Sequence, residues 1–460
     1  MPARSSLGAA VRRLGPRPLD REVARLALPA FAALLAEPLF LLAYSAIVGR
    51  LGVVPLAGLG IAGTVLLTAV GVFVFLAYAT TAAVARQLGA GDVPAALRQG
   101  VDGLWLAVGL GVVTAAVLWP VARTLSVALG AGPEVADASA AYLRASLPGL
   151  PAMLVVLAAT GVLRGLQDTR TPLVVAVAGA TANVPLNLVL VHGLGPVPAL
   201  GVAGSGLGTA LAQLGMGVAL AVVVTRGARR HGVALRPGGA GVLRSARDGT
   251  PLLLRTLTLR AAVVVTTVAA ARSGDTALAA HQVVATVWTA LALGLDALAI
   301  AGQALTGRTL GAGDVAGTHA VLRRLLGWGA VLGVLSGLVV LLGRGLLAPL
   351  FTPDVGVQGG IVAALLVVAL AQPLAAYVFV LDGVLIGAGD GRYLAAAGVV
   401  TLAAYLPLVG AVVVRAPTGT AGLVWLWAAF AGGYMLARAV TLGRRARGDA
   451  WAVTGAVRAR

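Results

Sequence analysis

The chain has 460 residues, of which 59% are hydrophobic and only 11% are charged, and its mean hydropathy is +0.97. This composition lies outside the range of soluble globular domains and predicts an integral membrane protein. The formal net charge of +18 would suit nucleic-acid binding, but the positions of the arginines argue against it. The chain contains no cysteine, which excludes disulfides and thiolate metal sites.

Apolar stretches follow one another along almost the whole chain. A helix needs about 20 residues to cross a bilayer. We count twelve stretches of that length: 22–49, 54–83, 99–119, 137–163, 171–192, 201–225, 248–272, 277–305, 320–343, 357–386, 393–414 and 420–441. The sequence therefore predicts an all-α polytopic membrane protein with twelve transmembrane helices.

An internal repeat of constant spacing divides these spans into two sets of six. Equivalent positions include the segments Leu88–Val93 and Leu310–Val315, and the proline pairs Pro29 and Pro251, Pro151 and Pro373, and Pro185 and Pro407. Because six is an even number, the second copy keeps the orientation of the first. We expect two six-helix lobes related by a pseudo-twofold axis along the membrane normal, with a transport pathway between them.

The arginines indicate the orientation of the chain. Most of the 34 basic residues lie in the N-terminal arm, in alternate loops and in the C-terminal tail, a positive-inside bias that puts both termini in the cytoplasm. We expect these arginines to hold anionic lipid headgroups. The predicted parts are a cytoplasmic arm (1–21), an N-lobe (22–225), a basic cytoplasmic linker (226–247), a C-lobe (248–443) and a cytoplasmic tail (444–460).

The first lobe carries a single acid in the middle of a span, Glu37, which Pro38 follows directly. Tyr44 lies two helical turns further along the same face. Asn183 and Asn187 form an i, i+4 pair on the fifth span, at nearly the depth of Glu37. A carboxyl group facing an amide in an apolar cavity can load and release a proton, so Glu37 is the candidate proton site. The alternative is a permanently protonated Glu37 that ties helices together.

The second lobe carries Arg255 and Arg260 on the seventh span and Asp296 on the eighth. The two helices run in opposite directions, and Arg255 and Asp296 fall at a similar depth. We expect these two residues to form an ion pair, either within the transport mechanism or as a purely structural contact.

Polar residues recur every seven positions on the eighth span. Gln282, Thr289, Asp296 and Gln303 form this stripe, which faces either the cavity or the seam between the lobes. Asp382 lies near the inner end of the tenth span. Its carboxyl group either titrates or hydrogen-bonds the Gly-rich turn that follows.

The repeated Leu-Gly-Ala-Gly-Asp turns are expected to be structural. Glycine permits a tight helix end, and the aspartates of Leu88–Val93 and Leu310–Val315 can cap the helices that follow. The sequence contains no Walker A motif, nucleophile elbow or Gly-rich dinucleotide loop, and its four histidines have no metal-ligand spacing. We therefore expect a transporter without a cofactor, and neither an enzyme nor a scaffold.

Four segments resemble the multidrug and toxic compound extrusion (MATE) family, in its DinF-like branch. They are Gly161–Pro172, Leu278–Gln282, Asp296–Ala304 and Leu381–Asp390. The resemblance implies a twelve-helix fold of two lobes. It also implies that the protein exports lipophilic, often cationic compounds by alternating access, in exchange for protons or sodium.

The chain departs from the family pattern at several positions that the resemblance marks as ion sites. The family usually has Asp at the position of Tyr44 and often has Asp at the position of Asn187, whereas Asn183 matches. A glutamate that other branches carry on the seventh helix falls near Leu259 or Arg260, and the acid of the tenth helix roughly matches Asp382.

With so few carboxylates in the first lobe, ion coupling falls either to Glu37 or to the second lobe, and uncoupled or differently coupled transport is a further alternative. We favour protons over sodium, because one carboxylate is too few to coordinate sodium. The predicted function is a secondary active, proton-coupled multidrug exporter in the inner membrane of a bacterium, acting as a monomer on small-molecule drugs or metabolites. The alternative within the wider superfamily is a flippase for lipid-linked compounds or oligosaccharides.

Overall fold

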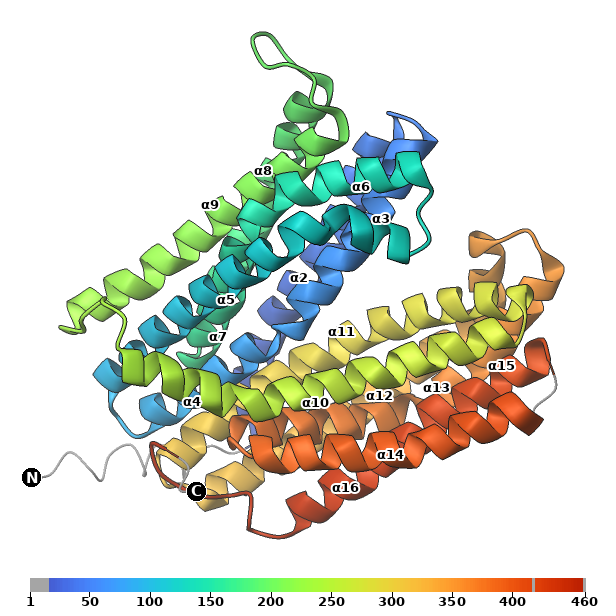
Figure 1. The fold of residues 1–460 in the computed structure, drawn as a ribbon. Coiled ribbons are helices and arrows are strands. Elements are labelled where there is room, and N and C mark those ends of the chain that lie inside the picture. The colour runs from blue at the N-terminus through green and yellow to red at the C-terminus, as the bar shows by residue number, and fades with distance from the viewer. Residues whose placement is uncertain (1–15, 416–417, 458–460) are drawn as a thin grey trace, which may run out of the picture. The chain divides into compact units, whose positions relative to one another are not determined.

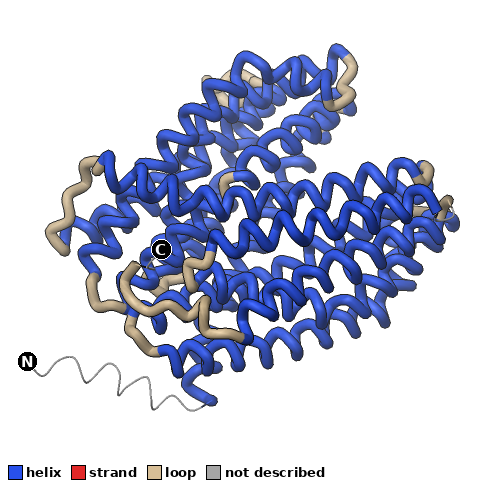
Figure 2. Tube along the Cα trace, turned by 60° about the horizontal axis from the view of Figure 1, so that its bottom comes forward, coloured by secondary structure: helices blue, strands red, loops and turns tan. Residues whose placement is uncertain are grey.

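The computed structural model describes residues 16–415 and 418–457, without the side chains of residues 16–17, 37 and 39–44. Within this part of the chain the structure is helical apart from short connections and one isolated bridge between Leu194 and Val197 (Figure 1, Figure 2). The helices are α2 (Pro16–Gly49), α3 (Val53–Val72), α4 (Phe75–Gly89), α5 (Val93–Ala128), α6 (Pro133–Ser146), η1 (Leu147–Gly149), α7 (Leu150–Gly165), α8 (Arg170–His192), α9 (Gly201–Arg230), α10 (Gly239–Arg272), α11 (Asp275–Gly311), α12 (Val315–Phe351), α13 (Val355–Gly387), α14 (Gly391–Arg415), α15 (Thr420–Trp427), η2 (Ala428–Tyr434) and α16 (Met435–Arg447).

Eleven helical segments of the described chain are long and apolar enough to cross a membrane. Three of them combine consecutive elements, as where α3 and α4 form the segment Val53–Gly89. The 34-residue helix α2 covers the remaining predicted span, 22–49. Every predicted span thus coincides with a helix, and the all-α, twelve-helix fold class is confirmed.

The chain divides into two compact units. One is Leu28–Gly249, and the other is Thr250–Arg460 together with Met1–Ala27. The chain passes from one unit to the other after Ala27 and again after Gly249. These two positions are equivalent in the repeat, because each of the two residues lies two positions before a repeated proline, Pro29 or Pro251. The start of α2 therefore belongs with the second half of the chain. The predicted linker 226–247 belongs wholly with the first half.

The start of α2 is fastened to the second half by charged side chains. The carboxylate of Asp20 pairs with Arg324 and accepts a hydrogen bond of 2.9 Å from the Trp328 indole Nε1–H. Glu22 pairs with Arg308 at 2.6 Å. The hydrogen bond from Arg324 holds the pKa of Asp20 below its ordinary 3.8, so this carboxylate is charged at neutral pH.

The repeated Leu-Gly-Ala-Gly-Asp turns end one helix and start the next in the same way in both units. Gly91 and Gly313 have φ values of +82° and +76°, a backbone region that glycine adopts without strain. The side chain of Asp92 accepts a hydrogen bond of 2.9 Å from the Ala95 amide and so caps α5. Asp314 caps α12 in the same manner, as the sequence predicted.

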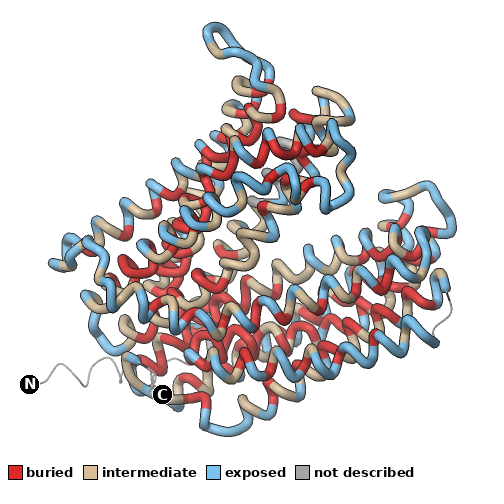
Figure 3. The backbone as a smooth tube through the Cα atoms, in the orientation of Figure 1, coloured by how far each residue is buried: buried red, intermediate tan, exposed pale blue. Residues whose placement is uncertain are grey.

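Buried residues follow the helix faces that meet inside each unit (Figure 3). Glycines allow helix backbones to approach closely at equivalent places in the two units. A Cβ atom on Gly161 of α7 would lie 2.5 Å from the Ala77 carbonyl oxygen of α4, and one on Gly383 of α13 would lie 2.5 Å from the Ala299 carbonyl oxygen of α11. The repeat therefore preserves one helix contact in both halves.

Candidate functional site

In the first unit, the predicted asparagine pair is buried and hydrogen-bonded internally. The side-chain amide of Asn187 donates to the Asn183 backbone carbonyl at 3.0 Å and also to the Asn183 side-chain oxygen. The amide of Asn183 in turn donates to the Gly208 carbonyl of α9 at 3.3 Å. Gly208 makes room for this arrangement, because a Cβ atom there would lie 3.1 Å from Asn187 Nδ2. The pair joins α8 to α9.

One atom of this pair has no partner. The side-chain oxygen Oδ1 of Asn187 is buried, and no hydrogen-bond donor among the described residues reaches it. A buried acceptor without a donor is costly, so it favours an incoming O–H or N–H group.

The two remaining candidates of the first lobe lie on α2. The backbone places Glu37 directly before Pro38 and well beyond Pro29, and both prolines lie inside the helix. The structure describes the backbone of Glu37 and Tyr44 but not their side chains. The expected proximity of Glu37 to Asn183 therefore stays a prediction.

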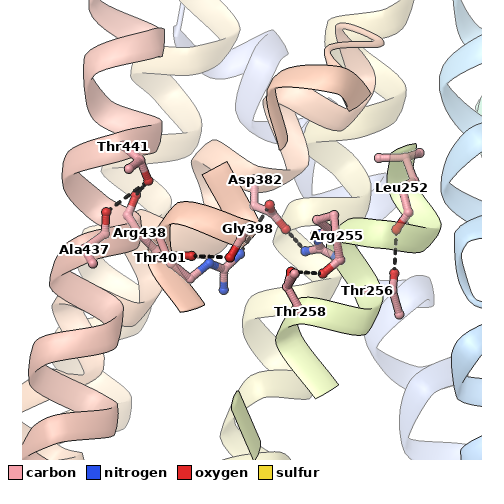
Figure 4. A network of polar contacts seen from close by, with 10 residues as sticks. All are labelled: Leu252, Arg255, Thr256, Thr258, Asp382, Gly398, Thr401, Ala437, Arg438 and Thr441. Atoms are coloured by element: carbon pink, nitrogen blue, oxygen red, sulfur yellow. Dashed lines mark hydrogen bonds and ion pairs between the residues drawn. The ribbon is translucent and has the colours of Figure 1, made fainter. Parts of the chain in front are cut away.

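In the second unit, three charged side chains from three helices meet, with one carboxylate between two guanidinium groups (Figure 4). Asp382 of α13 accepts a hydrogen bond from the Arg255 guanidinium of α10 through Oδ2. Its other oxygen, Oδ1, lies 3.3 Å from Nη2 of Arg438 on α16. All three residues are buried. Two guanidinium groups thus hold Asp382 from both sides.

The structure gives Arg255 an ion pair with Asp382, which the sequence did not predict. The expected pair of Arg255 with Asp296, and the expected titration of Asp382 or its bond to the adjacent turn, stay predictions. Arg438 was not anticipated at all, although an arginine within an apolar span is a recognisable signal. Asp296 is near enough to Arg438 to interact with it electrostatically.

The predicted polar stripe of α11 does not lie in one environment. Gln282 and Thr289 are exposed, Asp296 is half-buried and Gln303 is buried. The hydroxyl of Thr289 donates to the Ala285 carbonyl of its own helix at 2.8 Å. Gln303 lies at the contact with α13, where a Cβ atom on Gly387 would meet the Gln303 backbone. Exposure along the stripe therefore falls from the N-terminal part of α11 toward its C-terminal end.

Arg260, the second arginine of the seventh span, differs from Arg255. Its side chain is exposed, and it has no ion pair among the described residues. Arg255 is therefore buried and paired, whereas Arg260 is exposed and has no ion pair within the part of the chain that the structure describes.

An aromatic cluster that we did not predict surrounds the short π-helix η2. Ring contacts of 5.2–6.1 Å link Trp427, Phe430 and Tyr434 with Trp288 and Tyr405. Arg438 follows Tyr434 by one helical turn, so the π-helix lies directly before the turn that carries this arginine. π-helical turns occur often at functional sites. The sequence signal was an aromatic-rich span interrupted by Gly432-Gly433, which we read only as a transmembrane helix.

No group of three or more His, Cys, Asp or Glu residues that could hold a metal ion is found in the part of the chain that the structure describes.

Comparison with known proteins identifies relatives over most of the chain. The sequence model of the MatE family matches twice, over residues 29–189 and 251–411, and the two matches begin at the equivalent prolines of the repeat. Protein DETOXIFICATION 45, chloroplastic, of Arabidopsis thaliana is 30% identical over 415 residues, which are 82% of this chain and 71% of that protein. DNA damage-inducible protein F of Escherichia coli (strain K12) is 28% identical over 377 residues, covering 80% of this chain and 81% of that protein.

Solved structures show the same fold. A crystal structure of MATE in the bent conformation superimposes with a TM-score of 0.85, at 22% sequence identity, over 96% of this chain and 98% of that one. A crystal structure of MATE in the straight conformation gives a TM-score of 0.82 over the same shares of the two chains, also at 22% identity.

Proposed function

Because the chain belongs to the MatE family, whose members are transporters and not enzymes, we propose that it exports lipophilic compounds in exchange for protons by alternating access. The duplicated fold supports alternating access, since two units can provide two states that a proton and a substrate stabilise differently. MATE proteins of this fold have been crystallised in a bent and a straight conformation.

We place proton coupling at Glu37, and the observation that carries this proposal is the buried Asn187 oxygen without a donor. A protonated carboxyl group can donate to such an acceptor, whereas a carboxylate cannot. Depth along the spans puts Glu37 at the level of the asparagine pair. Proton binding at this site would therefore be coupled to a hydrogen bond between α2 and α8.

The choice of protons over sodium follows from the ligands available. Sodium needs several oxygen ligands, and the first unit offers one mid-span carboxylate on α2 together with amides. The Asn183 side-chain oxygen already accepts a hydrogen bond from Asn187. A proton needs only one carboxyl group and one acceptor.

The test is drug efflux from everted vesicles under an imposed pH gradient, with Glu37→Gln as the variant. Glutamine keeps the size of the side chain but cannot exchange a proton, so we expect pH-driven efflux to fall at least tenfold while substrate still binds. Glu134→Gln, an exposed position at the start of α6, is the matched control and should behave as wild type. Unchanged pH-driven exchange in Glu37→Gln would remove this residue from the mechanism.

The flippase alternative is less well supported. A flippase for phosphorylated carriers needs a strongly cationic cavity. In the second unit, Arg255 and Arg438 are both engaged by Asp382, which neutralises part of their charge. An exporter of small molecules therefore fits the charge distribution better.

We also propose that the chain resides as a monomer in the inner membrane of a bacterium, with both termini in the cytoplasm and with anionic lipids at its basic linker. The positive-inside bias supports this orientation. The linker carries six exposed arginines that have no ion pair among the described residues: Arg226, Arg229, Arg230, Arg236, Arg244 and Arg247. Contacts to α5 hold the linker in place, including a hydrogen bond of 2.9 Å from Trp105 Nε1 to the Leu235 carbonyl.

A further inference from the structure

Arg260 lies deep within a membrane-spanning helix. Arg272 is the last residue of α10, and Arg260 lies about 18 Å before it along the helix axis at about 1.5 Å per residue. The hydrocarbon core of a bilayer is about 30 Å thick, so with Arg272 at the outer edge the Cα of Arg260 lies near mid-depth.

The other deep charges of the second unit compensate one another. The cluster around Asp382 contains Arg255 and Arg438, and Asp296 interacts with Arg438. Two positive charges therefore face two negative charges. The charge of Arg260 is not compensated in this way, because no described residue forms an ion pair with it.

Water is the less costly environment for an exposed arginine at this depth that has no ion pair among the described residues. A guanidinium group in contact with lipid chains at the bilayer centre is strongly disfavoured, and from mid-depth its side chain does not reach either surface. The interior of the unit does not enclose it either, since the side chain is exposed. The remaining environment is a water-filled pathway, because ionisable residues within membrane spans that do not lie in the protein interior almost always face a water-filled cavity and mark substrate or ion pathways.

The neighbours of Arg260 on the same helix face are apolar. Leu257, three residues before it, is 43% exposed, and Val264, four residues after it, is 59% exposed. This face therefore presents one cationic group between apolar surfaces. Such a pattern matches a molecule with an apolar body and an acidic group.

We infer that Arg260 binds the acidic group of the transported compound, so that the substrates are amphipathic organic anions or zwitterions. This inference rests on the proposed function and narrows its substrate class, against the cationic compounds that the family resemblance implies. The planar guanidinium forms paired hydrogen bonds with a carboxylate, sulfonate or phosphate, and it repels an organic cation. Arg260 is thus a residue that determines substrate specificity.

The experiment measures binding of two dyes that share a ring system but differ in charge, fluorescein and rhodamine 6G. Purified protein is held in nanodiscs of zwitterionic lipid, and binding is followed by fluorescence anisotropy without any pH gradient. We expect wild type to prefer fluorescein. Arg260→Gln should weaken fluorescein binding about tenfold or more, Arg260→Lys should retain most of it, and Arg260→Glu should bind rhodamine 6G better than wild type does.

Arg272→Gln, an exposed arginine at the outer end of the same helix, is the matched control and should bind both dyes as wild type does. Thermal melting of each variant separates loss of binding from loss of fold. Fluorescein binding that is equal in wild type and a folded Arg260→Gln, or a wild-type preference for rhodamine 6G, overturns the inference. If fluorescein binds through Arg260 but is not moved by a pH gradient in proteoliposomes, the proton-coupled function fails and the assignment of Arg260 stands.

Discussion

The carboxylate of Asp382 stabilises two buried guanidinium groups at once. Arg255 and Arg438 approach it from different helices, and each is largely removed from solvent. Removing one partner of a buried ion pair is more destabilising than replacing the whole pair, because an uncompensated charge remains. The cluster therefore acts first as a link between α10, α13 and α16.

At this residue we predict that Asp382→Asn destabilises the protein by about 3 kcal/mol or more, because both arginines lose their counter-charge. Thermal melting in detergent measures the effect. Adding Arg255→Met to Asp382→Asn should recover part of the loss, since one buried charge is then removed. A double variant that is no more stable than Asp382→Asn would contradict the structural role of the pair.

Among the helices, the closest packing occurs where a glycine of one meets the backbone of another. Gly383 and Gly161 occupy equivalent positions of the repeat, and both face a carbonyl oxygen at a distance that excludes a methyl group. A methyl group at either position would therefore force the neighbouring helix away.

At this scale we predict that Gly383→Ala lowers stability by about 1–3 kcal/mol through overpacking. Gly327→Ala on α12 is the control, because nothing lies within 4 Å of a Cβ atom there and alanine is the better helix former. Melting temperatures should fall for the first variant and stay level or rise for the second. The opposite order would show that α11 and α13 can move apart at this contact.

For the molecule as a whole, the distribution of arginines predicts a lipid preference. Arg229 and Arg230 at the predicted inner end of α9 are exposed, as are Arg272 and Arg415 at the predicted outer ends of α10 and α14. The first pair belongs to the proposed anionic-lipid surface and the second pair does not. Each arginine near an anionic surface contributes about 1 kcal/mol of attraction.

We therefore expect the Arg229→Gln, Arg230→Gln double variant to retain phosphatidylglycerol about tenfold less well than wild type, relative to phosphatidylcholine, in native mass spectrometry. The Arg272→Gln, Arg415→Gln variant removes the same charge and should retain the lipid as wild type does. Equal losses in both variants would mean that net charge, and not the linker, governs lipid binding.

Much of the fold was predictable because its signals are local or repeated along the chain. Span length and hydropathy follow from the bilayer thickness, and all twelve predicted spans coincide with helices. The glycine and aspartate of each repeated turn act within one helical turn of the chain, so the caps at Asp92 and Asp314 were also predictable. The constant spacing of the repeated residues predicted the duplication that the family model matches.

The partners of polar residues were not predictable in this way. Helical rise gives the depth of a side chain but not the neighbouring helix that it faces, because that depends on how each helix is rotated and packed. Arg255 and Asp296 share a depth, yet packing brings Arg255 to Asp382 and adds Arg438 from the last helix. The same packing leaves Arg260, further along α10, exposed and without an ion pair to any residue that the structure describes, since the helix turns it away from the face that Arg255 buries.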